Sequence, residues 1–268
     1  MTPGALPSSS IHRKTKELVM TRLTRLLLLC AATLMASPSL AQPVYKVGST
    51  ATGVPYTFLD VKSNTIQGAM VDLITAIGDD AGFKVQVEAT PFSALVPSLS
   101  GGKIDIISAA MVITDARKQV IDFSDPVFPY PEGMVVKEED PTPYQGLADL
   151  KGATVGAQVG TIYVDYLRKE GQFAEVKTYD SLADLLRDVS LGRIKAGFGD
   201  APILTYQVSQ RKEFKVKVVK SYQPKMTSNV GLGVRKGNDE LLKKINASLA
   251  KLKSNGALDG ILAKWSLK

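Results

Sequence analysis

Arg117 is the first candidate for a functional residue, because of its charge and its position in the chain. It lies in the segment ITDARKQVIDFSDP (113–126), directly after an apolar run from Ile104 to Val112. Thr114 and Asp115 are typical of a helix start, where a hydroxyl caps free N–H groups and the helix dipole favours anions. A cation in that positive field is unfavourable unless an anion lies nearby. Either Asp115 supplies this anion and Arg117 is a solvated surface residue, or the anion is a ligand.

Asp200 lies at a second strand-to-helix junction, in the segment IKAGFGDAPIL (194–204). Because Pro202 suits the first turn of a helix, Asp200 is either the N-cap of that helix or a ligand-binding carboxylate. In open α/β sheets, ligands bind beyond the carboxyl ends of the strands, where helix N-termini present free N–H groups. One cation and one carboxylate, each at such a junction, predict a zwitterionic ligand between them.

Cysteine and histidine are nearly absent from the chain. There is one of each, Cys30 and His12, and both precede Gln42. From Gln42 onward, the composition therefore excludes Cys nucleophiles, Ser–His triads, thiolate or imidazole metal sites and disulfides. Catalysis would have to rely on carboxylates, Lys, Tyr or a hydroxyl. We expect no catalytic residues, no metal and no cofactor.

The first 41 residues have the pattern of a secretory signal peptide preceded by an N-terminal extension. A basic start leads to an apolar core from Leu26 to about Met35, and residues 39–41 (SLA) place small residues at both ends of a cleavage triplet. We predict cleavage near Ala41/Gln42. The apolar core is too short for a transmembrane helix, which needs ~20 apolar residues. This pattern predicts an exported, soluble protein.

The net charge of +7 is concentrated in this leader. The leader holds five basic residues and one acidic residue, which leaves 28 basic against 25 acidic residues in the remainder. No basic stripe with interleaved aromatic residues stands out there, so we expect no nucleic-acid partner.

Strand-like and helix-like runs alternate along the rest of the chain, which is typical of an α/β fold with mostly parallel sheets. The expected strands cover residues 44–50, 84–90, 104–111, 154–159, 175–180 and 194–200. The expected helices cover residues 70–82, 92–102, 161–171, 181–192, 201–212 and, as one or two helices, 238–268.

Two proline-containing, extended stretches break this alternation, at residues 125–137 and 222–236. Between them lies a segment with its own βαβ pattern. Two sheets joined by two extended crossings would form two lobes around a cleft. We expect a discontinuous first lobe of residues 42–131 and 228–268, and a second lobe of residues 132–227.

The chain from Val44 to Lys268 resembles the periplasmic solute-binding proteins of polar amino-acid ABC transporters, known as bacterial extracellular solute-binding proteins, family 3. The resemblance is carried by TPFSALVPSLSGGKIDIISAAMVIT (90–114), DARKQVIDFSDP (115–126), LKGATVGAQVGT (150–161), LGRIKAGFGDAP (191–202) and the segment from residue 230 to Trp265. It implies the two-lobed type II periplasmic-binding-protein fold, with two mostly parallel sheets joined by a two-crossing hinge. It also implies an α-amino acid held in the cleft when the lobes close.

The resemblance assigns roles to five positions. Arg117 matches the arginine that grips the ligand's α-carboxylate, and Asp200 matches the carboxylate that accepts from the α-ammonium. Ala110 matches a position that acts through its backbone, and Thr161 lies in the closing loop of the second lobe. Phe92 matches a position whose ring covers the ligand side chain, although a helix-core role would suit the same residue.

The chain departs from the family pattern at several site positions. Val112 and Ile162 stand where hydroxyl residues are usual, so the predicted pocket is more apolar than is usual in the family. Thr50 stands where an acidic residue is usual, so the pocket is less suited to a lysine- or arginine-like ligand. An aromatic residue is common where Gly53 stands, and Tyr56 is a candidate for the missing ring. Gln158 is a further candidate for a polar contact to the ligand side chain.

Three functions are compatible with these features. The first is a binding protein, not an enzyme, that delivers an amino acid or a related small carboxylate to the membrane permease of an ABC transporter in the periplasm. The second is an exported dehydratase that acts on prephenate-like or arogenate-like acids, with a carboxylic acid of raised pKa as general acid. The third is a ligand receptor for a membrane sensor.

Overall fold

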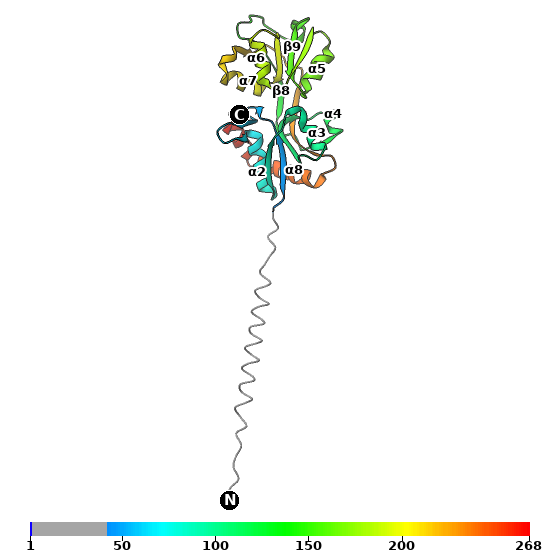
Figure 1. Ribbon diagram of the computed structural model, residues 1–268, viewed down its shortest axis with the longest axis vertical. Coiled ribbons are helices and arrows are strands. Elements are labelled where there is room, and N and C mark those ends of the chain that lie inside the picture. Colours follow the sequence, from blue (N-terminus) through cyan, green and yellow to red (C-terminus); the bar gives the residue numbers. More distant parts are fainter. Residues whose placement is uncertain (2–41) are drawn as a thin grey trace. The chain divides into compact units, whose positions relative to one another are not determined.

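The computed structural model describes residues 42–268, together with Met1, so the predicted signal peptide and N-terminal extension lie outside the described residues. In residues 42–268, strands and helices alternate as the sequence predicts. Figure 1 shows two groups of elements, one with α5, α6, α7 and β9 and one with α2, α3, α4 and α8, and β8 runs between them. The protein is therefore two-lobed.

The first lobe is built from the start and the end of the described chain. Its elements are β1 (Val44–Ser49), β2 (Thr52–Gly53), β3 (Thr57–Asp60), β4 (Thr65–Gln67), α2 (Ala69–Ala81), β5 (Lys84–Ala89), η1 (Phe92–Ala94), α3 (Leu95–Ser100), β6 (Ile106–Val112), α4 (Asp115–Lys118), β7 (Ile121–Phe123), α8 (Asp239–Ser254) and α9 (Ala257–Lys264).

The second lobe is continuous in sequence. Its elements are η2 (Leu147–Leu150), β9 (Thr154–Gln158), α5 (Ile162–Glu170), β10 (Glu175–Tyr179), α6 (Leu182–Ser190), β11 (Ala196–Asp200), α7 (Ala201–Gln210), η3 (Lys212–Phe214) and β12 (Val216–Val218). Two long strands, β8 (Pro129–Lys137) and β13 (Thr227–Arg235), connect the lobes.

The central strands of both lobes are buried on both faces. All seven residues of β6 are buried: Ile106 and Val112 belong to the cluster that includes α2, whereas Ile107 and Met111 pack with residues of α3. Helices on both faces explain why the sequence of this strand is a continuous apolar run rather than an alternating pattern. β1 pairs in parallel with β5 and β6, and β9 pairs in parallel with β10 and β11.

β8 and β13 change partners where the chain passes between the lobes. β8 pairs with β13 at residues 129–131 and with β11 at residues 132–135, and β13 pairs with β8 at residues 227–229 and with β6 from Val230. Strand pairing therefore runs continuously as β10-β9-β11-β8-β13-β6-β1-β5. The hydrophobic cluster beside this crossing also joins both lobes, since it contains Leu73 of α2 and Leu185 of α6.

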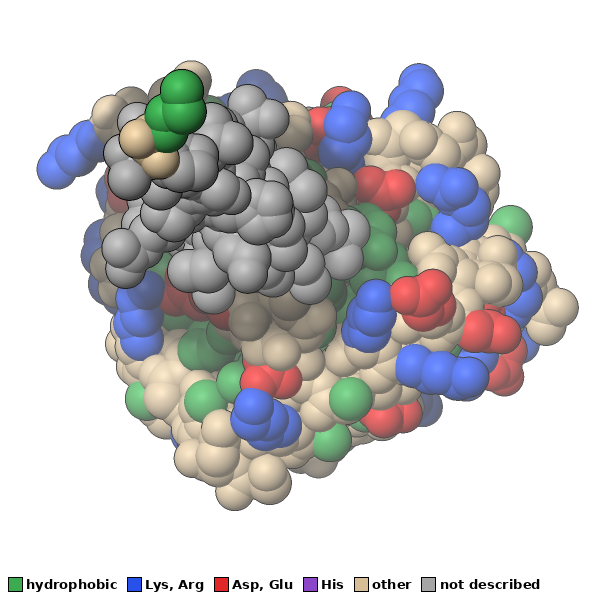
Figure 2. All heavy atoms as spheres, turned by 90° about the horizontal axis from the view of Figure 1, so that it is seen from below, with side chains coloured by type: hydrophobic (Ala, Val, Ile, Leu, Met, Phe, Trp, Pro, Cys, Tyr) green, Lys and Arg blue, Asp and Glu red, His purple; other side chains and the backbone are tan. Residues whose placement is uncertain are grey.

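Charged side chains of both signs lie on the molecular surface (Figure 2). On the face in Figure 2, basic and acidic side chains lie interspersed. The exposed ion pairs among the described residues include Lys244 with Glu240 and Lys251 with Asp80. Within residues 42–268, no helix is long and apolar enough to span a membrane.

Candidate functional site

Arg117 lies on the short helix α4, directly after β6. The hydroxyl of Thr114 accepts a hydrogen bond from the backbone N–H of Arg117 at 3.2 Å, which confirms the predicted N-cap. The guanidinium donates through Nη1 to the carbonyl oxygen of Val112 at 2.6 Å and through Nη2 to the carbonyl oxygen of Gly160 at 2.9 Å. Gly160 precedes α5, so Arg117 reaches from the first lobe to the second.

Asp115 does not pair with Arg117 in the structure. Asp115 is almost fully exposed and its carboxylate lies 3.6 Å from Lys118 Nζ, not beside the guanidinium. Arg117 itself is half-buried, and its burial lowers the pKa of the guanidinium, while the negative charge of Asp200 opposes that shift. The guanidinium also lies over the ring of Phe92, with Cζ 5.7 Å from the ring centroid. Arg117 thus faces Phe92 and the opposite lobe.

Asp200 ends β11 and occupies the N-cap position of α7, with Pro202 in the first turn. Its side chain makes no capping hydrogen bond. Instead, the hydroxyl of Tyr163 donates to Asp200 Oδ1 at 2.7 Å. Burial raises the pKa of Asp200 to about 6, against the opposing effects of the Tyr163 hydrogen bond and of Arg117. The carboxylate is therefore turned away from its own helix and toward α5.

Thr161 and Ile162 begin α5 at the point where the two lobes touch. Thr161 is the N-cap residue, but its hydroxyl donates to the carbonyl oxygen of Gln158 at 2.7 Å and does not cap the helix. Gly160 has φ +79°, and a Cβ at this position would lie 2.8 Å from Ser93 Cα in the first lobe. Only glycine fits this close approach of the two backbones.

Ala110 has an unusual backbone conformation within β6. Its φ is +49°, a left-handed value that is uncommon for a residue with a Cβ. Three residues of β6, 108–110, stand opposite the single residue Leu232 of β13, because Ile107 pairs with Gly233 and Met111 pairs with Gly231. Such a bulge redirects backbone groups out of the strand ladder. This geometry suits the expectation that position 110 acts through its backbone.

The remaining candidates form contacts within the protein. Tyr56 is buried against Phe128 and Tyr130, at centroid distances of 5.4 and 5.1 Å, and burial raises its pKa to about 12. The hydroxyls of Thr50 and Thr57 lie 2.6 Å apart, and Gln158 Nε2 donates to the carbonyl oxygen of Asp180 at 3.0 Å. Thr50 and Gln158 are both buried and have partners of their own.

The structure brings some candidates together and leaves others apart. Arg117, Phe92, Val112 and the loop before Thr161 are in direct contact, and the charge of Asp200 acts on Arg117. No hydrogen bond or ion pair joins Thr50 or Gln158 to Arg117 or Asp200 in the part of the chain that the structure describes.

Tyr163 is a residue that sequence reasoning missed. Its position two residues after the N-cap Thr161 places it in the first turn of a helix beside the predicted cleft. That position is the one signal that could have drawn attention to it.

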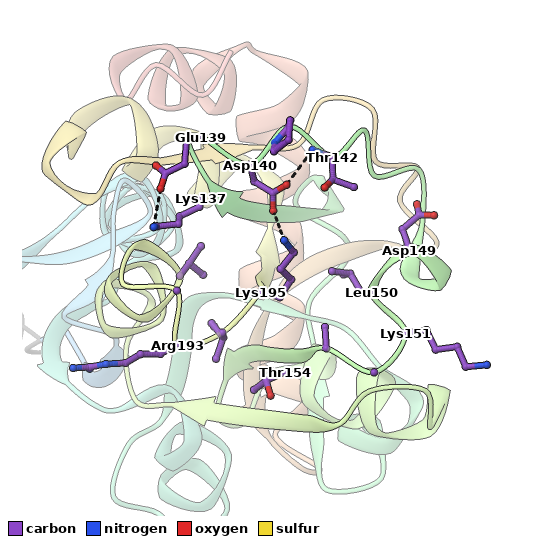
Figure 3. A pocket seen from close by; sticks show the side chains of 16 residues that line it. Lys137, Glu139, Asp140, Thr142, Asp149, Leu150, Lys151, Thr154, Arg193 and Lys195 are labelled. Atoms are coloured by element: carbon purple, nitrogen blue, oxygen red, sulfur yellow. Dashed lines mark hydrogen bonds and ion pairs between the residues drawn. The ribbon is translucent and has the colours of Figure 1, made fainter.

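A separate surface pocket lies in the second lobe. It has a volume of about 860 Å³ and is lined by residues that include Lys137, Asp140, Arg193 and Lys195 (Figure 3). Two of its cations are paired with acidic residues of the lining: Lys195 lies 2.8 Å from Asp140, and Lys137 lies 2.7 Å from Glu139. None of the predicted site residues lines this pocket. No group of three or more potential metal-ligating side chains occurs in residues 42–268.

The amino-acid sequence matches a known protein family. The family model of bacterial extracellular solute-binding proteins, family 3, matches residues 45–268. An arginine-binding periplasmic protein of Mannheimia haemolytica is 31% identical over 212 residues, which cover 79% of this chain and 86% of that protein.

Solved structures show the same fold. An ancestral arginine-binding protein bound to glutamine has a TM-score of 0.78 and 34% identity, and the match covers 85% of this chain and 99% of that one. An ancestral amino acid-binding protein described as a precursor of cyclohexadienyl dehydratase has a TM-score of 0.73 and 30% identity, with 83% and 94% covered. These likenesses confirm the two-lobed type II periplasmic-binding fold, and the chain belongs to the bacterial extracellular solute-binding proteins, family 3.

Proposed function

We propose that this protein binds an α-amino acid, or a closely related small carboxylate, between its lobes and presents it to the membrane permease of an ABC importer. The observation that carries this proposal is the pair Arg117 and Asp200. They lie on opposite lobes, each at the carboxyl end of a strand, and the charge of each affects the pKa of the other. A cation and a carboxylate in this arrangement match the two charged ends of an amino acid.

Arg117 is the expected anchor for the ligand's carboxylate. A planar guanidinium can form two parallel charge-assisted hydrogen bonds to a carboxylate, which an ammonium group cannot. The start of α5 supports the same end of the ligand, because the Thr161 side chain does not cap the helix and its first N–H groups carry the positive end of the dipole.

Asp200 is the expected acceptor for the ligand's ammonium group. Tyr163 donates to Oδ1, so Oδ2 is the oxygen that the ammonium would approach. A bound cation would also lower the pKa of Asp200 and favour its ionised form. Closure about the crossings at residues 129–131 and 227–229 would bring Asp200 and Thr161 onto a ligand already held by Arg117.

The ligand's side chain is expected to be neutral. Among the residues assigned to the site, Asp200 is the single carboxylate, and Val112 and Ile162 are apolar. The hydroxyl of Thr50 is already paired with that of Thr57. A buried guanidinium or lysine ammonium would require a second carboxylate to offset its desolvation. The arginine-binding relatives make arginine the direct comparison ligand.

The dehydratase activity is the second candidate. It is favoured by the pKa of Asp200 of about 6, because a general acid needs a carboxyl group that is protonated near the working pH. The likeness to an amino acid-binding protein described as a precursor of cyclohexadienyl dehydratase supports this second candidate. Incubation with prephenate, followed by the absorbance of an aromatic product, tests this candidate.

A thermal-shift screen tests the main proposal. The chain from Gln42 onward would be unfolded, washed, refolded and screened against the amino acids, prephenate and other small carboxylates. A ligand at 100 times its Kd stabilises the native state by ~2.7 kcal/mol, which is readily visible as a rise in Tm. A selective rise with amino acids, lost in Arg117→Ala, supports the proposal. A response to a carboxylate without an amino group alone would remove the ammonium-binding role of Asp200, and no response to any of these compounds would overturn the proposal.

We also infer that the protein works in the periplasm after removal of its leader. The support is the periplasmic location named for its relatives and the signal-like pattern of the first 41 residues. N-terminal sequencing of the exported protein, expected to begin at Gln42, tests this inference.

A further inference from the structure

Glu132 is a buried carboxyl group at the crossing between the lobes, and its side chain is 1% exposed. It lies in β8 and is the direct antiparallel partner of Asp200 in β11. Directly opposed residues on neighbouring strands point to the same face of a sheet, with Cβ atoms about 4.5–5.5 Å apart. Glu132 is therefore the nearest neighbour along the sheet of the carboxylate proposed to bind the ligand.

The same residue holds the second crossing. Its carboxylate oxygen Oε2 accepts a hydrogen bond from the backbone N–H of Lys225 at 3.2 Å, and its own backbone N–H donates to the carbonyl oxygen of Met226 at 3.0 Å. Lys225 and Met226 directly precede β13, the strand that returns the chain to the first lobe. A residue of β8 thus contacts the residues that lead into β13, through its backbone and through its side chain.

Three tyrosines surround these two carboxyl groups. Tyr163 and Tyr166 lie three positions apart on α5, which places them on the same side of the helix. Tyr163 donates to Asp200, whereas Tyr166 and Tyr222 are close enough to Glu132 that its charge would raise the pKa of each. The hydroxyls of Tyr166 and Tyr222 and the oxygen Glu132 Oε1 are buried and make no hydrogen bond among the described residues.

Burying the carboxyl group of Glu132 costs free energy of folding, because the group loses its contact with water. Burial raises the pKa of Glu132, mainly through desolvation. An apolar side chain of the same length would avoid that cost. The geometry shows what the acid does instead, since Oε2 accepts the partly buried hydrogen bond from the backbone N–H of Lys225.

We propose that Glu132 is a positioning residue for ligand binding, whose carboxyl group holds the second crossing against β8 and thereby sets where Asp200 stands when the lobes close. The effect on ligand affinity rests on the proposed function, but the effect on the arrangement of the lobes does not. Glu132 acts through the crossing and through Asp200 without touching the ligand.

Two substitutions of similar length separate this role from simple packing. Glu132→Gln keeps an oxygen acceptor for the Lys225 N–H, whereas Glu132→Met fills a similar volume without one. Glu138→Ala is the matched control, because Glu138 follows the same strand but is exposed. The chain from Gln42 onward lacks cysteine, so Lys103→Cys and Lys151→Cys, at exposed positions of the two lobes, allow spin or fluorophore pairs to report the interlobe distance.

The expected result is a rescue pattern. Without any ligand, Glu132→Met shifts or broadens the interlobe distance distribution, while Glu132→Gln and Glu138→Ala match the parent protein. With L-glutamine and L-arginine as probes, any affinity that the parent shows falls at least tenfold in Glu132→Met and stays within about threefold in Glu132→Gln. Unchanged distances in Glu132→Met, or failure of Glu132→Gln to rescue, would overturn the proposal.

Two further provisions keep the test decisive. If Glu132→Met does not fold, amide hydrogen exchange in the parent protein replaces it: the Lys225 amide should be strongly protected, and free exchange there would overturn the proposal. If neither probe binds the parent protein, L-glutamine and L-arginine are excluded as ligands, and the ligand-free distances decide the role of Glu132.

Discussion

Arg117 Nη2 donates a hydrogen bond across the lobes to the carbonyl oxygen of Gly160, 43 residues later in the chain, at 2.9 Å. Arg117 follows the end of β6 in the first lobe, and Gly160 follows the end of β9 in the second. The contact brings together two strand-to-helix junctions that are distant in sequence. A ligand carboxylate held by Arg117 would therefore also meet the start of α5.

Replacing Arg117 tests this junction directly. Arg117→Ala should weaken ligand binding at least 100-fold, because hydrogen bonds to charged groups contribute about 1.5–3 kcal/mol each. Arg117→Lys should restore only part of this loss, since lysine cannot make two parallel bonds. Isothermal titration calorimetry measures both variants, and Lys118→Ala is the control for a nearby exposed cation. Unchanged affinity in Arg117→Ala would remove Arg117 from the site.

Ligand affinity should depend on pH through Asp200. Its pKa of about 6 lies above the usual value, so the carboxylate is largely protonated below pH 6 and ionised above it. Only the ionised form attracts an ammonium group. Affinity should therefore rise as the pH increases through about 6 and level off above it, with about a tenfold loss per pH unit well below 6. A flat profile between pH 5 and 8 would contradict this role.

Tyr163→Phe refines the same measurement. The hydrogen bond from Tyr163 lowers the pKa of Asp200, so its removal should raise that pKa and move the midpoint of the affinity profile to higher pH. The affinity at pH 8 should fall by no more than about fivefold, which corresponds to one hydrogen bond of ~1 kcal/mol. A midpoint that stays in place would show that Tyr163 does not act on Asp200.

Gly160→Ala should prevent full closure. The new Cβ would lie 2.8 Å from Ser93 Cα. Because Ser93 Cα is a backbone atom, the clash can be relieved only by moving the chain. Gly192→Ala is a matched control, because Gly192 also has positive φ but would place its Cβ in open space. Both variants should lose about 1–2 kcal/mol of stability from backbone strain. Only Gly160→Ala should also lose ligand affinity, and equal affinities in the two would contradict the contact.

Ala110 should tolerate glycine but not a branched side chain. Glycine relieves the strain of φ +49° while increasing the entropy of the unfolded chain, so Ala110→Gly should change the free energy of unfolding by less than about 1 kcal/mol. Ala110→Val should cost more than about 2 kcal/mol, because it adds steric clash in a buried, left-handed position. Chemical denaturation measures both, and a stable Ala110→Val would refute the assigned conformation.

Much of the fold follows from local patterns. The cap at Thr114 and the apolar run of β6 are properties of neighbouring residues, and the structure confirms both. The same is true of the alternation of strands and helices, because hydrophobic periodicity reflects which faces are covered.

The site is harder to predict because it depends on side-chain choices between distant partners. Asp200 occupies an N-cap position, yet its carboxylate binds Tyr163 rather than its own helix. Gln158 and Asp180 come together because β9 and β10 are adjacent, so the amide of Gln158 finds a backbone acceptor there. No sequence period reports which of two competing partners a polar side chain will take.

The placement of β13 has a consequence for how the molecule is made. This strand lies between β8 and β6, although it comes at residues 227–235, more than 100 residues after β6. During synthesis, the first 131 residues therefore lack the strand that completes their sheet and the helices α8 and α9 that cover it. Because such long-range pairing must wait for the end of the chain, the N-terminal half cannot finish folding on its own as it leaves the ribosome.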